Sequence, residues 1–327
     1  ARSFIPFLLL FGRDKHSEKA GYDASGILYR HGFLIMKIAF IKCECCGNDY
    51  VYIDSGSPIL RESISKTALI NDDEFFKKLT VSLSDRRFGI GSDGAVFYKF
   101  PTGKTEYDLE IRMYNSDGSE GLLCGTALRS AACILDEKLL KSGLQKNSYK
   151  IKTASGIKIV KKDDLFGFIA EIGKADFSAG EKFSILKKPV INYAFCCGVS
   201  LTLLSVGNLH AVAFIDDIKS FDLENFYKTV KRSKIFTAPF NLEIAKVTSD
   251  NSLLTRVYEN GSGETLCCGT GACAVAAAAV LLKKIASKSI NTTFNGGTVS
   301  VKCDQSYNLS VGGTVKKVFT GVYYYEP

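Results

Sequence analysis

Two stretches decide the fold of this 327-residue chain: Tyr114–Thr126 (YNSDGSEGLLCGT) and Tyr258–Thr270 (YENGSGETLCCGT). A shift of 144 residues superimposes them, with six identities in thirteen positions. Both end in Cys-Gly-Thr and lead into small-residue sequence typical of a helix, and a shorter echo precedes each copy, at Gly47-Asn48 and at Gly207-Asn208. The sequence therefore predicts two duplicated halves about a pseudo-twofold axis, with both Cys-Gly-Thr turns facing one cleft.

Periodicity predicts the elements around these turns. Apolar or alternating runs predict strands at residues 37–42, 50–54, 94–99, 108–114, 149–152, 157–161, 166–172, 200–206, 211–215, 242–247, 253–258, 298–302, 308–311 and 319–324. Helical patterns cover residues 73–83, 125–142, 219–232 and 270–285. Repeated strand–helix–strand units with a glycine fingerprint are absent from the sequence, which argues against a doubly wound dinucleotide fold. The predicted fold class is α+β, built from two pseudo-symmetric mixed α/β domains.

The first 35 residues are expected to form an extension outside the fold. Met36 is one of only two methionines and stands directly before the first clean strand pattern. The short apolar burst at Phe4–Phe11 is compatible with a weak signal h-region, so a targeting segment, upstream translation and structure remain alternatives. The two halves are expected over residues 36–150 and 151–317.

Composition excludes several classes of protein. Hydrophobic residues make up 46 % and charged residues 23 %, as in ordinary globular proteins. No apolar run reaches the ~18 residues of a membrane span. The net charge of +8 is spread along the chain without a basic block, which favours a solvated surface over nucleic-acid binding. Only three histidines are present (16, 31 and 210), which leaves little room for a Ser-His-Asp triad or a multi-histidine metal site.

Eleven cysteines are an odd number, and several are near neighbours, an arrangement that suits free thiols in a reducing cytoplasm better than a disulfide framework. The cluster Cys43-x-Cys45-Cys46, with Cys196-Cys197, lacks the Cys-x2-Cys spacing of zinc ribbons. Buried packing is the favoured interpretation of these residues, and no metal site is expected.

Cys124 and Cys268 are the candidate chemical groups. Each stands where a turn enters a predicted helix, and the unpaired N–H groups and dipole of a helix N-terminus favour a thiolate. The same N–H groups, from Gly125-Thr126 and Gly269-Thr270, form a ready anion site. Two such helices aimed at one point could hold a carboxylate between two thiols.

This arrangement suits stereoinversion at an α-carbon. One group removes the α-proton on one face, and a second group of matched pKa returns a proton on the other face. The carboxylate must be stabilised as it gains enolate character. Two cysteines could do this without pyridoxal phosphate or another cofactor, whereas a single copy of the motif would favour a purely structural turn.

Five ordered motifs of the sequence resemble those of diaminopimelate epimerases. The resemblance covers about residues 36–327. The motifs are Cys46-Gly47-Asn48-Asp49-Tyr50, residues 87–94 (RFGIGSDG), residues 114–125 (YNSDGSEGLLCG), residues 206–210 (VGNLH) and residues 258–271 (YENGSGETLCCGTG).

The resemblance implies a pyridoxal-independent epimerase that interconverts LL- and meso-diaminopimelate on the lysine and peptidoglycan pathway. By position, the catalytic cysteines are Cys124 and Cys268. The matching substrate-binding residues are Asn48, Asn115, Gly125, Thr126, Asn208, His210, Asn241, Glu259, Asn260, Gly269 and Thr270. Residues near 318–327 are expected to return to the first half, as the last strand does in the family.

The sequence departs from the family pattern at three places. Thr126-Ala127 stands where the family usually has Asn-Gly, and Leu209 replaces a usual Pro. Asn260 stands where the family usually has an Arg whose guanidinium would bind the distal carboxylate of the substrate. Losing such a charged hydrogen bond costs roughly 1.5–3 kcal/mol.

Asn260 leaves the substrate open. Another base, such as Arg256, could cover the distal carboxylate, or the enzyme could act on a different amino acid with the same cysteine pair. A non-catalytic thiol- or metal-binding relative is the alternative from another class. The expected partner is a small amino-acid substrate, with no nucleic acid and no membrane, and a homodimer is the candidate assembly.

Overall fold

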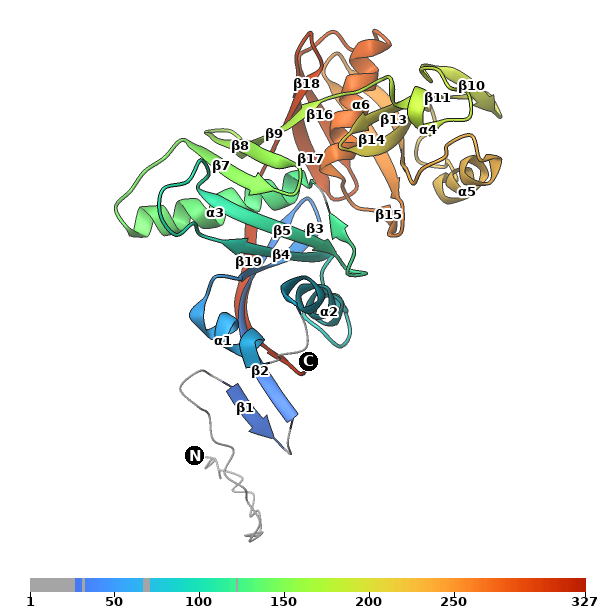
Figure 1. Ribbon diagram of the computed structural model, residues 1–327. Coiled ribbons are helices and arrows are strands. Elements are labelled where there is room, and N and C mark those ends of the chain that lie inside the picture. Colours follow the sequence, from blue (N-terminus) through green and yellow to red (C-terminus); the bar gives the residue numbers. More distant parts are fainter. Residues whose placement is uncertain (1–26, 31–32, 67–70, 122) are drawn as a thin grey trace, which may run out of the picture.

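The computed structural model describes residues 27–30, 33–66, 71–121 and 123–327 and shows two halves, each wrapped around one helix (Figure 1). The first repeated unit contains β2 (Phe33–Cys45), β3 (Asn48–Asp54), α1 (Pro58–Lys66), α2 (Asp72–Ser84), β4 (Gly94–Lys99), β5 (Leu109–Asn115), β6 (Glu120–Gly121), α3 (Gly125–Lys141), β7 (Ser148–Thr153), β8 (Gly156–Asp163) and β9 (Gly167–Lys174).

The second repeated unit contains β11 (Val199–Val206), β12 (Asn208–Phe214), α5 (Leu223–Ser233), β13 (Asn241–Ser249), β14 (Ser252–Glu259), β15 (Gly263–Thr265), α6 (Gly269–Leu281), β16 (Ser289–Phe294), β17 (Gly297–Cys303) and β18 (Asn308–Gly313). Outside the two units lie β1 (Ile27–Arg30), α4 (Ala179–Phe183), β10 (Tyr193–Cys196) and β19 (Lys316–Tyr325).

Strand pairing repeats between the two units. In the first, β2–β3 is antiparallel, β3–β4 parallel, β4–β5 antiparallel and β5–β7 parallel, followed by the meander β7–β8–β9. In the second, the corresponding pairs β11–β12, β12–β13, β13–β14, β14–β16 and β16–β17–β18 have the same directions. The internal sequence repeat is therefore a repeat of topology, and the α+β class with two pseudo-symmetric halves is confirmed.

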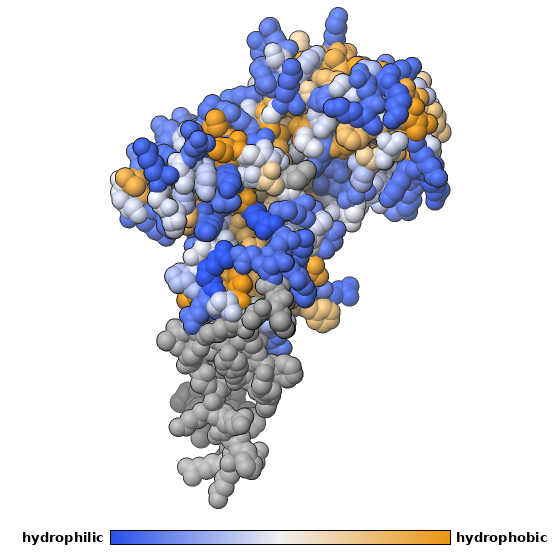
Figure 2. All heavy atoms as spheres, viewed as in Figure 1, coloured by the Kyte–Doolittle hydropathy of each residue, from blue (hydrophilic) through white to orange (hydrophobic). Residues whose placement is uncertain are grey.

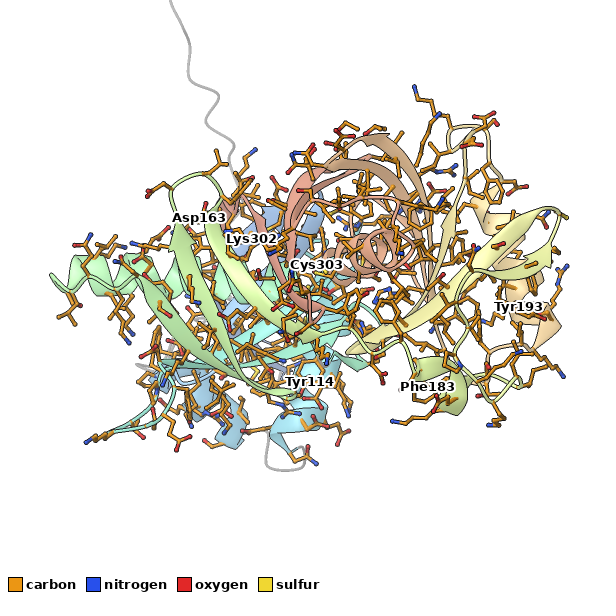
Figure 3. All side chains as sticks on the ribbon, turned by 90° about the horizontal axis from the view of Figure 1, so that it is seen from above. Tyr114, Asp163, Phe183, Tyr193, Lys302 and Cys303 are labelled. Atoms are coloured by element: carbon orange, nitrogen blue, oxygen red, sulfur yellow. The ribbon has the colours of Figure 1, made fainter. Side chains whose placement is uncertain are left out.

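The halves are joined where β9 pairs with β18 in antiparallel fashion, from Asn308↔Lys174 to Gly313↔Gly167. Figure 3 shows them side by side: Tyr114 and Asp163 belong to one half, Phe183 and Tyr193 to the far side of the other, and Lys302 and Cys303 of β17 lie between. The expected division at 150/151 lies inside β7, because the repeated unit extends to the end of β9.

Both ends of the described chain meet on one strand. β19 pairs with β2 from Lys316↔Glu44 to Tyr325↔Met36, so the segment around 318–327 lies against the first half. β2 begins at Phe33, before the expected start at Met36, and its first residues pair with β1 in a hairpin. Ile35 is buried, so the fold reaches slightly into the expected extension. Residues 1–26, which include the apolar burst, lie outside the described residues.

Three apolar clusters of described residues form the core of the protein. The central one surrounds α3 and α6 and runs between the halves, and the other two lie beneath α1 and α2 and beneath α4 and α5. The alanine run of α6 is buried on every side, since strands of its own half surround it.

The outer helices carry polar caps. The Asn71 side chain accepts the Glu74 N–H at the start of α2, and Asp222 accepts the Asn225 N–H at the start of α5. Within the described residues, no helix is long and apolar enough to cross a membrane. Hydrophilic residues cover most of the face seen in Figure 2.

Candidate active site

The two Cys-Gly-Thr turns meet at the contact between α3 and α6. Cys124 and Cys268 are the N-cap residues of these helices, and both have extended backbone (φ −141°, ψ 123° and φ −131°, ψ 118°). The helix starts touch: a Cβ added to Gly269 would lie 3.6 Å from the Gly125 Cα. The structure thus brings together the two turns that the repeat predicts to face each other.

A cavity of about 540 Å³ opens at this meeting point. Its lining includes nine of the predicted site residues: Asn48, Asn115, Cys124, Gly125, Asn208, Glu259, Cys268, Gly269 and Thr270. The other four predicted residues, Thr126, His210, Asn241 and Asn260, are not part of this lining. Thr126, His210 and Asn241 are buried, and Asn260 is exposed.

Amide groups at both helix starts are available to an anion. The first intrahelical bonds run from Leu128 N to Cys124 O and from Ala272 N to Cys268 O. The N–H groups of the preceding residues therefore have no acceptor within their own helix ladder. With the dipoles of two helices directed to one place, this arrangement is suited to a carboxylate.

Cys268 lies in an apolar and negatively charged environment. It is 5 % exposed, and its Sγ accepts a hydrogen bond from Gly271 N at 3.3 Å and lies 3.4 Å from Thr270 Oγ1. Burial, and next the charges of Glu259 and Glu243, raise the pKa of this thiol well above its ordinary value. Cys268 is therefore held as the neutral thiol in the ligand-free protein.

Cys124 has a different environment. Burial raises the pKa of its thiol, but the N–H groups of Ala127 and Thr126 and the Tyr50 hydroxyl act in the opposite direction. No carboxylate contributes appreciably to this shift. Of the two thiols, Cys124 has more neighbours that lower the pKa and so oppose the effect of burial.

Glu259 lies beside Cys268. Its Oε1 accepts a hydrogen bond from Thr265 Oγ1 at 2.5 Å, and it interacts with the Cys268 thiol. Burial is the main cause that raises the pKa of this carboxyl, and Glu243 adds to the increase. A half-buried carboxylate at the wall of the cavity is a suitable partner for a substrate ammonium group.

His210 and Glu243 form a buried pair behind this wall. His210 Nδ1 lies 2.7 Å from Glu243 Oε1, and neither side chain is exposed. A Cβ added to Gly271 would lie 2.7 Å from the same Glu243 oxygen, so the pair packs directly against the first turn of α6. His210 thus supports the turn that carries Cys268 and does not line the cavity itself.

Replacing His210 with alanine should destabilise the protein. The change leaves the Glu243 carboxyl buried without its partner, and breaking a buried pair in this way costs about 3–5 kcal/mol. Urea unfolding followed by circular dichroism measures the loss. Glu243→Gln, which keeps an acceptor for His210, should lose less. A His210→Ala variant within 1 kcal/mol of the unchanged protein would contradict the prediction.

Asn260 is turned toward α5. Its Oδ1 accepts a hydrogen bond from the Tyr227 hydroxyl at 3.1 Å, and its backbone N–H donates to Asn241 Oδ1 at 3.0 Å. Asn241 therefore holds the loop after β14. At this position the chain therefore has a neutral amide that already has a hydrogen-bond partner.

Arg256 does not supply the missing charge. Its Nε and Nη2 pair with Glu264 at 2.7 and 2.8 Å, and its Nη1 donates to the carbonyls of Ile218 and Phe221. Among the described residues that line the cavity, two are carboxylates, Glu120 and Glu259, and none is Lys or Arg.

A second hollow of about 630 Å³ adjoins the cavity and shares the residues Asn48, Tyr50, Asn115 and Glu259 with it. It contains Arg86, whose guanidinium pairs with Asp49 at 2.8 Å and Asp93 at 2.9 Å. The arginine of this hollow is thus committed to two carboxylates. Within the described ranges, no group of three or more His, Cys, Asp or Glu is arranged to hold a metal ion.

Three residues of the site were not predicted from the sequence: Tyr50, Glu243 and Arg129. Tyr50 pairs with Gly94 in the first half as His210 pairs with Asn241 in the second, so Tyr50 and His210 occupy equivalent positions. If the alignment of Gly47-Asn48 with Gly207-Asn208 is extended by two residues, Tyr50 falls on His210. This extension would have identified Tyr50 from the sequence.

Glu243 is a charged residue in the apolar run 242–245, a signal of a buried pair. Arg129 is 1 % exposed, and its positive charge lowers the pKa of Cys124. It lies four residues after Gly125, on the same face of α3, and its Nη1 would lie 3.4 Å from a Cβ added to Gly125. This i, i+4 spacing from the Cys-Gly-Thr turn is the signal that could have found it.

Comparison with known proteins agrees with this geometry. The family model described as diaminopimelate epimerase matches residues 40–177 and 202–318. A diaminopimelate epimerase of Methanococcus maripaludis is 31 % identical over 293 residues, covering 86 % of this chain and 98 % of the relative. That of Leptospira biflexa is 32 % identical over 301 residues, covering 88 % and 99 %.

Solved structures share the fold at low sequence identity. A hydroxyproline epimerase from Agrobacterium vitis has a TM-score of 0.58 at 12 % identity, covering 89 % of this chain and 93 % of that one. A phenazine biosynthesis protein of the PhzF family from Bacillus anthracis has a TM-score of 0.57 at 15 % identity, covering 88 % and 99 %. The family model and the relatives together show that this chain is an isomerase that belongs to the diaminopimelate epimerase family.

Proposed function

We propose that the protein interconverts LL- and meso-2,6-diaminopimelate, with Cys124 and Cys268 as the two acid/base groups and without pyridoxal phosphate. The observation that carries the proposal is the pair of cysteines at two touching helix starts, both lining one cavity. The lysine and peptidoglycan pathway and a reducing cytoplasm are the expected setting, since the reaction needs free thiols.

The α-carboxylate of the substrate would lie between the two helix starts, against N–H groups of residues 125, 269 and 270. Glu259 would bind the α-ammonium group, because it is the carboxylate of the cavity wall next to Cys268. This orientation places the α-carbon between the two sulfur atoms, one on each face.

Proton transfer then follows from the two environments. The Cys124 thiolate takes the α-proton as the C–H bond breaks, and the electron pair passes into an enolate stabilised by the helix amides. The Cys268 thiol gives its proton to the opposite face, which forms the inverted α-carbon and leaves Cys268 as a thiolate. In the reverse direction the two roles exchange.

The test is direct. Reduced protein is incubated with LL-diaminopimelate, and the isomers are separated by chromatography. Conversion to the meso isomer supports the proposal. Absence of conversion over hours at micromolar enzyme would refute diaminopimelate as substrate, and the same assay would then be repeated across a panel of L-amino acids.

A second candidate function is racemisation of a different amino acid by the same cysteines. It is favoured by Asn260, by the two carboxylates of the cavity and by the commitment of Arg256 and Arg86 to other carboxylates. These features suit a substrate whose side chain ends in a neutral or cationic group. A substrate whose side chain ends in a carboxylate would find no free cationic group among the described residues that line the cavity.

Asn260→Arg distinguishes the two candidates. A guanidinium at this position would add a charged hydrogen bond to the distal carboxylate, about 1.5–3 kcal/mol, so kcat/KM for diaminopimelate should rise roughly 10- to 150-fold. Steady-state kinetics of the isomer assay measures the change, and Asn260→Gln, which adds length without charge, is the control. Equal values for the two variants would contradict the expected gain.

A further inference from the structure

Two thiols outside the proposed catalytic pair come together beside the cavity. Cys46 lies in the turn between β2 and β3 of the first half, and Cys267 directly precedes Cys268 in the second half. The Cys46 thiol donates to the Thr298 carbonyl oxygen of the second half at 3.6 Å and also contacts Cys267, and each of the two thiols has the largest influence on the pKa of the other. The two residues are 221 positions apart in the sequence, so the contact joins the two halves.

Close backbone packing fixes this contact. Gly296 N donates to Leu266 O at 2.9 Å, and a Cβ added to Gly296 would lie 1.9 Å from the Cys46 carbonyl oxygen. A Cβ added to Gly297 would lie 3.0 Å from Cys46 Sγ, and one added to Gly47 would lie 2.8 Å from the Leu266 side chain. The turn at 46–47, the segment 266–267 and the turn at 296–297 therefore pack against one another.

Cys46 also has the electronic character of a reactive thiol. The neighbouring Cys267 thiol lowers its pKa to about 7, burial opposes the decrease, and the positive charge of Arg129 adds to it. The pKa of every other shifted thiol in the described residues is raised, for example to about 12 at Cys43 and Cys273. Cys46 is half-buried, and Cys267 lines the hollow of about 630 Å³, so a small oxidant can reach the pair.

We propose that Cys46 is a peroxide-reactive thiol that forms a disulfide with Cys267 and thereby links the two halves next to the cavity. The Cys46 thiolate attacks one peroxide oxygen, so that an S–O bond forms, the O–O bond breaks and hydroxide leaves to become water. The Cys267 sulfur then attacks the sulfenic sulfur. The S–S bond forms, the S–O bond breaks, and the second hydroxide takes the Cys267 proton. Both thiols are oxidised and one peroxide is reduced to water.

The disulfide would act on the proposed epimerase reaction, and this part of the inference rests on that function. It ties the residue before Cys268 to the turn that carries Asn48, and both Cys268 and Asn48 line the cavity. Activity should fall at least tenfold on oxidation and return with dithiothreitol.

Thiol mapping tests the inference without reference to activity. Reduced full-length protein is treated with a few equivalents of hydrogen peroxide at pH 7.5, quenched with N-ethylmaleimide, digested without reduction and analysed by tandem mass spectrometry. A peptide that links Cys46 to Cys267 is expected. It should persist in Cys45→Ser, which changes the neighbouring thiol. Cys267→Ser, which keeps a donor beside Cys46 but cannot form the disulfide, should leave a Cys46 sulfenic acid that dimedone traps. Failure to find the linked peptide at full peroxide consumption would overturn the proposal.

Activity separates this disulfide from direct oxidation of the catalytic pair. Cys46→Ser should keep its activity under peroxide doses that inactivate the unchanged protein. Equal inactivation of the two would show that oxidation at Cys124 or Cys268 is responsible and would overturn the regulatory role. If neither protein turns over any amino acid, the proposed function fails, and the peptide map still decides whether the disulfide forms.

Discussion

Cys124→Ala and Cys268→Ala should each lower kcat/KM for epimerisation by about 10³-fold or more, in both directions of the reaction. Each variant removes the acid/base group from one face of the α-carbon, and a positioned acid or base contributes roughly 10²–10⁴-fold. Neither thiol can substitute for the other, because they approach from opposite sides. Both variants should remain folded, since the change removes one buried sulfur atom from a helix start.

Cys267→Ala is the matched control for these variants. It removes the thiol directly next to Cys268, from a residue as buried as its neighbour, 4 % against 5 % exposed. The repeat aligns Cys267 with Leu123, so it should keep close to full activity in reducing buffer. Full turnover by either alanine variant at 124 or 268, or an equal loss in Cys267→Ala, would contradict the assignment.

Glu259→Gln should lower kcat/KM by roughly 10- to 150-fold, the loss of one charged hydrogen bond of about 1.5–3 kcal/mol to the substrate ammonium group. It should also change the titration of Cys268. The negative charge of Glu259 raises the pKa of that thiol, so removing the charge lowers the pKa and increases the thiolate fraction at a fixed pH.

The change in the Cys268 pKa is measured from the pH dependence of alkylation by iodoacetamide, followed for each cysteine-containing peptide by mass spectrometry. In Glu259→Gln the profile of Cys268 should move to lower pH. Cys124 is the internal control, because Glu259 is not among the main causes of its pKa shift. An unchanged Cys268 profile would contradict the charge effect of Glu259 on this thiol, and an unchanged kcat/KM would contradict its role in binding the ammonium group.

Much of the fold could be predicted from the sequence because the chain repeats itself. The two Cys-Gly-Thr turns predicted where α3 and α6 begin. The repeat also predicted that the two halves are related by a pseudo-twofold axis. The elements that were missed have weak patterns: β16 (SINTTF) alternates buried apolar or threonine positions with half-exposed polar ones. The division expected at 150/151 falls inside β7, and the meander β7–β9 has no composition change that would mark the end of the repeated unit.

Prediction of the site was uneven for a related reason. Residues at helix starts and strand ends, such as Cys124 and Asn48, follow from the repeat. His210 was expected near the reacting amino group, but it is fully buried against Glu243, a contact between neighbouring strands that depends on register. The pairing of Cys46 with Cys267 depends on how three turns from two halves pack, which no local pattern shows.

The most direct test of the two-thiol account is the fate of the α-hydrogen in 2H2O. Reduced protein is given protiated LL-diaminopimelate, and both isomers are analysed by mass spectrometry during the first few per cent of conversion. If one thiol removes the proton and the other returns a solvent-derived one, the meso product should carry one deuterium while the remaining LL substrate stays protiated. Product that retains its α-protium, or label that enters substrate and product equally from the start, would contradict the assignment of Cys124 and Cys268 to opposite faces.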